Sequence, residues 1–273
     1  KNETLIGNLV FLNNWIIRTE LTNALDKVFI RNIITNEEEE LIFTDEKVYD
    51  PSVSLRQKDR DTDEIYISYS TPKTQNRTYL YNIKTKEKKL VKEQIIPSGH
   101  EPNDYIVERL ECPSHDGRVV PITITRHKNT PIDGSAELLL YGYGSYGHSM
   151  SPTFSSTRLS LIKRNIIWAT AHIRGGMERG MKWWKEGKML NKKNTFEDFI
   201  SCAKFLIKEK YTSEKKIIAY GGSAGGLLIG AVINKAPELF LGAILAVPFV
   251  DNLTTNMDHS LPLSKGELLE FAD

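Results

Sequence analysis

Length, composition and charge exclude several classes of protein. The chain has 273 residues, of which 40% are hydrophobic and 26% charged, which is ordinary for a folded protein of one large domain or two smaller ones. The 36 basic and 35 acidic residues give a formal charge of +1, which argues against nucleic acid or a membrane surface as partner. The two cysteines, Cys112 and Cys202, make no disulfide framework or metal set and are interpreted as reduced, buried thiols of a cytoplasmic protein.

The first 96 residues resemble a series of short β-strands. β-Branched and aromatic residues gather in short runs between turn-forming or charged stretches, and helical spacing is absent. Strands are predicted over residues 9–12, 15–18, 27–34, 41–43, 65–70 and 78–83. The acidic run 37–40 is expected to be a solvated loop or a strand edge. The segment 97–104 holds two prolines and a glycine, which predicts a domain boundary.

After this boundary the sequence predicts strands that alternate with helices. Residues 105–112 and 119–126 flank the pair Asp116-Gly117, which indicates a β-hairpin. A helix is predicted to begin at Asn194, because Asn194 and Glu197 are spaced as a capping box and apolar residues then recur at helical spacing. Further strands are predicted over residues 137–141, 166–171, 216–220 and 242–247. The alternation predicts an α/β fold with a mostly parallel sheet covered on both faces.

Residues 220–226 carry the strongest functional signal. They read Tyr-Gly-Gly-Ser-Ala-Gly-Gly, which matches the G-x-S-x-G nucleophile elbow. An apolar strand precedes the run and a helix-compatible segment follows it, and this context places a serine on a strained turn that faces substrate. The sequence therefore predicts Ser223 as a nucleophile. The alternative is a glycine-rich turn with a purely structural role.

A serine nucleophile also needs a base, an acid and donors for the oxyanion. In this fold the acid and the histidine follow the serine by several strand–helix units, so His259 is too close to be the expected base, and Asp251 is expected to cap a helix or lie in a loop. The backbone N–H of Ala224 is one donor by position. The loop 141–147, rich in glycine and tyrosine, is expected to supply the second, unless it is merely structural. The segment 172–180 is expected at the same end of the sheet.

Taken together, these segments resemble the prolyl oligopeptidase family of serine peptidases, and most closely its oligopeptidase B members. The resemblance covers roughly residues 65–273. It is carried by residues 141–147, 174–180 with Trp183 or Trp184 and Gly187, 193–196, 221–226, 236–240, 247–251 and 262–267. It implies a β-propeller joined to an α/β-hydrolase domain. Residues 1–96 would be the C-terminal part of the propeller, and residues 97–273 a peptidase domain that is incomplete at its C-terminus.

The resemblance also implies roles for individual residues. Ser223 would be the nucleophile, with the Ala224 N–H and the Tyr143 hydroxyl as oxyanion donors. Glu267 would bind the basic side chain of the substrate. Arg174 and Glu178, from the family's Arg-Gly-Gly-Gly-Glu motif, are also expected to contact substrate.

The sequence departs from the family pattern at several positions. Met177 replaces the third glycine of that motif and is expected to crowd the site. Leu269 stands where a second pocket acid would be, so the preference for Arg or Lys would rest mainly on Glu267. Ser151 and Thr153 replace two acids that favour a second basic residue. The family's catalytic acid and histidine would lie beyond Asp273.

These observations predict a cytoplasmic serine peptidase that cleaves short peptides after Arg or Lys through an acyl-enzyme, without metal or organic cofactor. The chain alone is expected to be inactive, and a separately encoded C-terminal segment is a candidate partner besides the short basic peptides. Two alternatives remain. One is a carboxylesterase-type α/β-hydrolase, and the other is a non-catalytic remnant of a decayed peptidase gene. For Glu267 the alternative is an ordinary charge on a surface helix.

Overall fold

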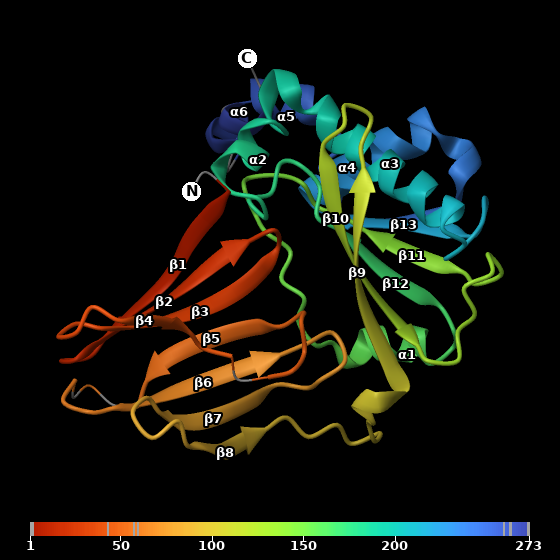
Figure 1. Cartoon of the computed structure of the whole chain (residues 1–273). Coiled ribbons are helices and arrows are strands. Elements are labelled where there is room, and N and C mark those ends of the chain that lie inside the picture. Colours follow the sequence, from red (N-terminus) through yellow and green to blue (C-terminus); the bar gives the residue numbers. More distant parts are fainter. Residues whose placement is uncertain are drawn as a thin grey trace.

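The computed structural model describes residues 3–42, 44–56, 58, 60–258, 260–261 and 264–271. Its N-terminal strands, red to dark yellow in Figure 1, lie beside an α/β layer that contains the remaining strands and all the α-helices. The 3₁₀-helix η1 (Pro102–Asp104) lies in the connection between the two parts. No helix within the described ranges is long and apolar enough to cross a membrane.

The N-terminal part consists of two antiparallel sheets with four strands each, ordered β1-β2-β3-β4 and β5-β6-β7-β8. The strands are β1 (Thr4–Phe11), β2 (Trp15–Thr22), β3 (Leu25–Asn32), β4 (Glu38–Glu40), β5 (Asp50–Leu55), β6 (Glu64–Ser70), β7 (Arg77–Asn82) and β8 (Lys88–Glu93). Alternate residues such as Ile17 and Ile30 of the first sheet join Ile65 and Ile67 of the second in one apolar cluster. The two sheets therefore bury one face each against the other.

The structure confirms most of the strands predicted here and corrects one. The prediction over residues 41–43 is wrong, because the paired strand is Glu38–Glu40, which bonds to Phe29–Arg31 of β3. Leu41 follows it and is buried, and Phe43 lies outside the described residues. The acidic run therefore lies mostly in an edge strand, which confirms the second of the two expectations for it. Glu38 and Glu40 form ion pairs with Arg18 and Lys27.

The second part is built on a six-stranded sheet with the order β14-β13-β11-β12-β10-β9. Strands β11, β12, β13 and β14 are parallel, and the hairpin β9–β10 continues the sheet in antiparallel fashion. The strands are β9 (Tyr105–Pro113), β10 (Val119–His127), β11 (Leu138–Tyr141), β12 (Ile167–Ala171), β13 (Ile217–Gly222) and β14 (Phe240–Ala246). The hairpin and all four later strands are confirmed with shifts of one or two residues. Because the four parallel strands end at one edge, the loops that follow them meet there.

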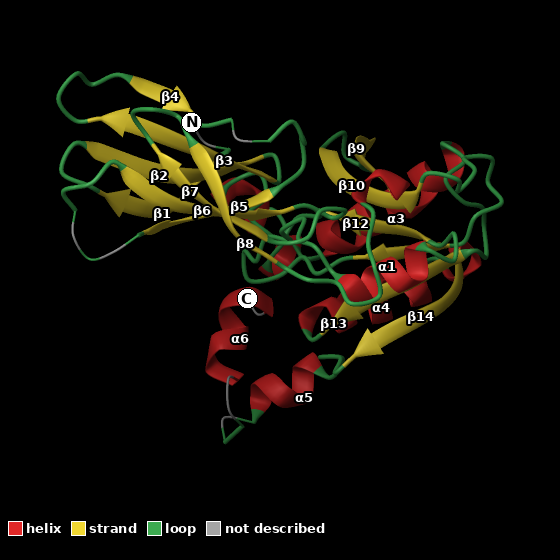
Figure 2. Cartoon of the chain, turned by 90° about the horizontal axis from the view of Figure 1, so that it is seen from below, coloured by secondary structure: helices red, strands yellow, loops and turns green. Residues whose placement is uncertain are grey.

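Helices cover both faces of this sheet. Helices α3 and α4 pack on one face in the main apolar cluster, and α1 packs on the other against Leu139 and Trp168. Figure 2 shows α5 and α6 as a pair at the periphery, reached from the end of β14. The helices are α1 (Ser156–Ile162), α2 (Met181–Lys185), α3 (Lys193–Lys208), α4 (Ala224–Lys235), α5 (Asn252–Met257) and α6 (Ser264–Phe271), with 3₁₀-helices η2 (Met189–Asn191) and η3 (Pro237–Leu239).

The predicted helix exists, but its predicted start is wrong. Helix α3 begins at Lys193 and no side chain caps it. Asn194 lies inside the first turn and donates to Glu186 O at 2.9 Å, so it does not form a capping box with Glu197. Glu197 instead pairs with Lys235 of α4 at 2.6 Å. The short helix η2 delivers the chain directly into α3, which leaves no extended residue to act as a cap.

Candidate active site

Ser223 stands at the junction between strand β13 and helix α4. Its backbone φ of 54° and ψ of −120° are a rare combination for a residue with a side chain, and such strain gathers at functional sites. The residue is exposed, and its N–H donates to Ala246 O at 2.9 Å. A methyl group on Gly221 would lie 2.3 Å from Gly225 O, so the close approach of strand and helix requires glycine there. The predicted strand–turn–helix context of the serine is confirmed.

Two groups beside Ser223 can donate hydrogen bonds to a developing negative charge. Ala224 is the first residue of α4, whose first-turn N–H groups have no acceptor inside the helix. Tyr143 lies in the loop after β11, and its hydroxyl lies close enough to the Ser223 side chain to interact with it. Burial raises the pKa of Tyr143 and the carboxylates of Glu267 and Glu270 add to the rise, although the interaction with Ser223 acts the other way. The phenol therefore keeps its proton at neutral pH and stays a donor.

Glu267 lies on α6, next to the loop that carries Tyr143. Its Oε2 accepts a hydrogen bond of 2.5 Å from the Tyr146 hydroxyl, and no ion pair joins it to a lysine or arginine in the described part of the chain. Burial, together with this carboxylate, raises the pKa of Tyr146. The ring of Tyr146 also contacts Tyr143 and Phe271, with centroids 6.2 and 5.7 Å away. Glu267 is thus a half-buried carboxylate beside the loop that carries Tyr143, with no ion-pair partner among the described residues.

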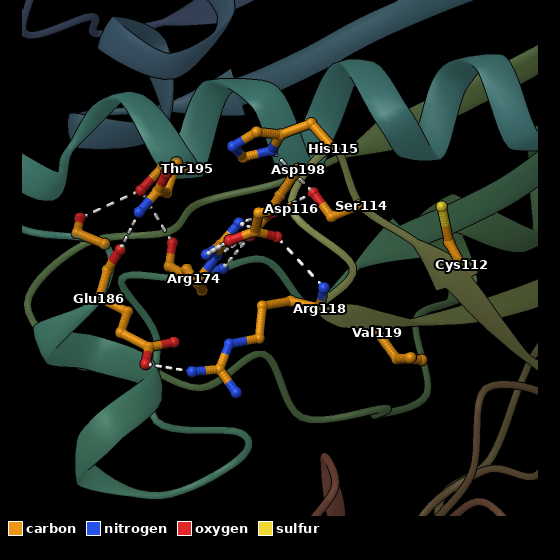
Figure 3. A network of polar contacts seen from close by, with 12 residues as sticks. Cys112, Ser114, His115, Asp116, Arg118, Val119, Arg174, Glu186, Thr195 and Asp198 are labelled. Atoms are coloured by element: carbon orange, nitrogen blue, oxygen red, sulfur yellow. Dashed lines mark hydrogen bonds and ion pairs between the residues drawn. The ribbon is translucent and has the colours of Figure 1, made fainter.

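Arg174 occupies a different environment from the one that a substrate contact requires. It is 1% exposed, and its guanidinium lies between two carboxylates (Figure 3), donating to Asp198 at 2.6 and 2.8 Å and to Asp116 at 2.6 and 3.3 Å. Asp198 also accepts a 2.5 Å hydrogen bond from Ser114 Oγ. All three side-chain nitrogens of Arg174 are therefore hydrogen-bonded within the protein. The pairs tie the β9–β10 turn and helix α3 to the segment after β12.

Glu178 is also buried, with 2% of its surface exposed. Its Oε1 accepts from Met150 N at 3.0 Å, and its backbone O accepts from Ala24 N of the N-terminal part at 2.7 Å. His172 Nδ1 lies 3.8 Å from the same carboxylate. Burial and the nearby Arg109 lower the pKa of His172 to about 4, although Glu178 acts in the opposite direction. This cluster lies where the two parts of the chain meet, and its side chains are buried from solvent.

The remaining predicted positions divide into several cases. Met177 packs against Gly147, where an added methyl group would lie 2.2 Å from its Cε, so it fills space beside the Tyr143 loop. Asp251 caps α5 by accepting from Thr254 N at 3.1 Å, which confirms the capping role expected for it. His259 lies outside the described residues. Leu269 is exposed, and Ser151 is hydrogen-bonded to Asp50 of β5.

Several residues around the site were missed by the sequence reasoning. Lys192, Trp184 and Glu270 form a buried polar group beneath the Tyr143 loop. The only sequence signal was the spacing of Glu270, three residues after Glu267 on one helix. Within the described residues no group of three histidine, cysteine or acidic side chains is placed to hold a metal ion, and the thiols of Cys112 and Cys202 are buried and free.

Comparison with known proteins finds similarity to one family of peptidases. The sequence profile of the prolyl oligopeptidase family matches residues 152–273. Dipeptidyl aminopeptidase BI of Pseudoxanthomonas mexicana is 38% identical over 274 residues, which cover 100% of this chain and 37% of that protein. Protease 2 of Moraxella lacunata is 41% identical over 251 residues, which cover 92% of this chain and 36% of that protein.

A solved structure agrees with these relatives. Oligopeptidase B from Trypanosoma brucei, in a closed form with covalently bound antipain, superposes with a TM-score of 0.91 and 35% sequence identity. The superposition covers 99% of this chain and 39% of that chain. The chain thus spans a little over a third of the length of the relatives that it matches.

Proposed function

Because the profile of the prolyl oligopeptidase family matches residues 152–273 and a relative is 38% identical over 274 residues, we propose that the chain belongs to this family of serine peptidases. It would carry the nucleophile and the substrate pocket of an oligopeptidase that cleaves short peptides after Arg or Lys. One observation carries the proposal. An exposed serine on a strained elbow lies beside a tyrosine that stays protonated, and helix α6 carries a carboxylate with no ion-pair partner among the described residues. An esterase needs the elbow but has no use for such a carboxylate.

Each residue then has a defined part in the reaction. The Ser223 Oγ attacks the carbonyl carbon of the scissile peptide bond and loses its proton to a general base. The negative charge that develops on the carbonyl oxygen is stabilised by the Ala224 N–H and the Tyr143 O–H. Collapse of the tetrahedral intermediate releases the amine and leaves an acyl group on Ser223, which water then removes.

The base and its supporting acid are inferred to come from outside the described residues. No described histidine is hydrogen-bonded to Ser223. Asp251 is occupied as a helix cap, and His172 is buried with its Nε2 hydrogen-bonded to Thr123. The chain as given is therefore expected to turn over substrate negligibly by itself, since loss of triad members costs several orders of magnitude. A segment that supplies both residues, on the same or a separate polypeptide, would complete the site.

The pocket is inferred to select basic side chains through Glu267. A guanidinium or ammonium group entering beside Tyr146 would meet a carboxylate that pairs with no cation in the part of the chain that the structure describes. Charge-assisted hydrogen bonds of this kind are about twice as strong as neutral ones. Leu269 offers no second charge, so the selection would depend on one acid. Arg174, whose guanidinium is bound between two carboxylates, and Glu178, which is 2% exposed, are left out of the substrate contacts.

The N-terminal sheets support a second part of the proposal. Consecutive four-stranded antiparallel sheets that pack face to face are the repeating unit of β-propellers, so residues 1–96 are inferred to be two propeller blades and residues 97–273 to belong to the hydrolase domain. The free, buried thiols of Cys112 and Cys202 support a reducing, cytoplasmic compartment.

The test compares kcat/KM for otherwise identical fluorogenic peptides ending in Arg, Lys, Gln or Phe. It uses the protein produced from its complete coding sequence, in wild-type, Ser223→Ala and Glu267→Gln forms. Ser223→Ala should abolish turnover, and Glu267→Gln should lower the Arg-over-Gln ratio roughly 30-fold or more, as expected when a buried charged pair loses one partner.

The matched control is Glu238→Gln, which removes an exposed carboxylate of η3 and should leave every ratio unchanged. An Arg-over-Gln ratio that survived Glu267→Gln would overturn the pocket assignment and make Glu267 an ordinary surface charge. Hydrolysis of simple esters without peptides would favour the carboxylesterase alternative, and the absence of any turnover would favour a non-catalytic remnant.

A further inference from the structure

Lys192 lies at the entrance to helix α3, with its ammonium group beneath the loop that carries Tyr143. The Nζ donates to Gly144 O at 2.7 Å, to Ser145 Oγ at 2.6 Å and to Glu270 Oε1 at 3.3 Å. The Lys192 side chain is 11% exposed and that of Glu270 2%. One ammonium group therefore contacts both the loop beside the nucleophile and helix α6.

Glu270 is bound on its other side as well. Its Oε2 accepts from the indole N–H of Trp184 at 2.9 Å, so both carboxylate oxygens have a partner. The ring of Phe271 lies 5.0 Å from Lys192 Nζ and packs on Phe249. Burial of a charge is favourable only when its hydrogen bonds are satisfied, and this pair meets that condition.

Besides this pair, the described contacts of helix α6 include a hydrogen bond from Lys188 Nζ to Leu269 O at 3.1 Å and packing against α5 and η2. The Lys188 side chain is solvent-accessible, so the buried pair is the interior anchor of the helix. Helix α6 is eight residues long, shorter than an isolated helix needs for stability in water, and Leu268 and Leu269 face solvent. Glu267 and Glu270 are three residues apart and so lie on one side of the helix. Glu267 contacts Tyr146, and Glu270 contacts the lysine under Gly144 and Ser145.

We propose that the buried Lys192–Glu270 pair is the positioning contact that fixes helix α6 against the Tyr143 loop, and thereby sets the place of the pocket acid Glu267 relative to Ser223. Neither residue touches the reacting atoms. The inference that this contact governs substrate affinity rests on the proposed function, whereas the inference that it holds α6 does not. Loss of the pair should release α6 while α3, which has its own apolar face in the core, stays folded.

The experiment uses the chain itself and needs no turnover. Hydrogen–deuterium exchange is measured for the amides of Ser264–Phe271 and of Lys193–Lys208, and calorimetry gives the Kd of benzamidine, an amidinium probe of the pocket. The variants are Lys192→Met, Glu270→Gln and Glu267→Gln. The matched control is Lys235→Met, which removes the ammonium of an exposed pair with Glu197.

Lys192→Met and Glu270→Gln should each speed exchange in α6 about tenfold or more and weaken benzamidine binding by a similar factor, while exchange in α3 stays at the wild-type rate. Glu267→Gln should abolish benzamidine binding without loosening α6, and Lys235→Met should change neither. If one of the two variants fails to fold, exchange in α3 will be faster than in the wild type, and the other variant then provides the test.

Unchanged hydrogen exchange of α6 in both Lys192→Met and Glu270→Gln would overturn the proposal. Faster exchange of α6 with undiminished benzamidine binding would overturn it as well. If the wild-type chain did not bind benzamidine but α6 still loosened in Lys192→Met, the proposed specificity would fail while the role of the pair in holding α6 would stand. If benzamidine bound through Glu267 and the exchange of α6 were unchanged in Lys192→Met and Glu270→Gln, the proposed function would stand and this inference would fail.

Discussion

Replacing Arg174 by glutamine tests whether this arginine serves the substrate or the fold. The substitution removes a guanidinium that donates to Asp198 at 2.6 and 2.8 Å and to Asp116 at 2.6 and 3.3 Å. Asp198 is 0% exposed, so it would be left as a buried carboxylate with fewer donors. Breaking a buried pair in this way costs about 3–5 kcal/mol. The Asp116 side chain is 35% exposed, so its share is discounted to at most about 1 kcal/mol.

The expected total is a loss of about 3–6 kcal/mol, which corresponds to a fall in Tm of roughly 6–24 °C for a domain of this size. Thermal unfolding followed by circular dichroism at pH 7 measures it. The matched control is Arg118→Gln, which breaks a pair with Glu186 whose side chains are 44% and 23% exposed and should cost less than about 1 kcal/mol. A Tm of Arg174→Gln within about 1 °C of the wild type, together with a raised KM for basic peptides, would refute the structural role.

Three further outcomes are expected. Ser223→Gly should raise the Tm, because the φ of 54° and ψ of −120° cost a serine about 1–3 kcal/mol and a glycine much less. Ser223→Ala keeps the backbone strain and should leave the Tm unchanged. Equal Tm values for the two variants would contradict the presence of strain at this residue. Burial and Arg109 lower the pKa of His172 to about 4, so between pH 6.5 and 4 this histidine is protonated in the unfolded chain but neutral in the folded one. The free energy of unfolding should therefore fall by up to ~3 kcal/mol as the pH drops from 6.5 to 4. Urea titrations of His172→Gln should show this slope flattened, and an unaltered slope would assign it to other groups. Gly147→Ala should lower the Tm, because its methyl group would lie 2.2 Å from Met177 Cε, and Met177→Ala should recover part of the loss; no recovery would leave the positive φ of 67° as the whole cause.

The strands with a clear alternation of apolar residues could be predicted from the sequence, and those defined by pairing could not. Strand β8 is exposed throughout and rich in lysine, so it gave no apolar pattern and exists because β7 offers it a partner. Strand β5 begins Asp-Pro and contains only Val53 and Leu55 as apolar residues. The prediction of a strand over 41–43 followed the apolar residues, whereas the backbone pairing lies on Glu38–Glu40.

In the candidate site, too, only the features defined by neighbouring residues could be predicted from the sequence. The elbow around Ser223 could be predicted because the steric demands of a tight turn are met by neighbouring residues in the sequence. The partners of Arg174 are Asp116 and Asp198, and those of Lys192 are Ser145 and Glu270. These contacts join segments far apart along the chain, and a buried lysine has no local signature that separates it from an exposed one. A motif resemblance therefore gave Arg174 a substrate contact that its buried ion pairs do not support.

Two of the edge strands, β8 and β14, differ in how they would behave in concentrated solution. Strand β8 carries exposed lysines at 88, 89 and 92, and charge on an edge strand discourages another chain from pairing with it. Strand β14 carries Leu241 and Ile244, which are 57% and 45% exposed, and among the described strands only β13 pairs with it. Self-association of the chain should therefore begin at β14, and a lysine at position 241 or 244 is the substitution expected to suppress it.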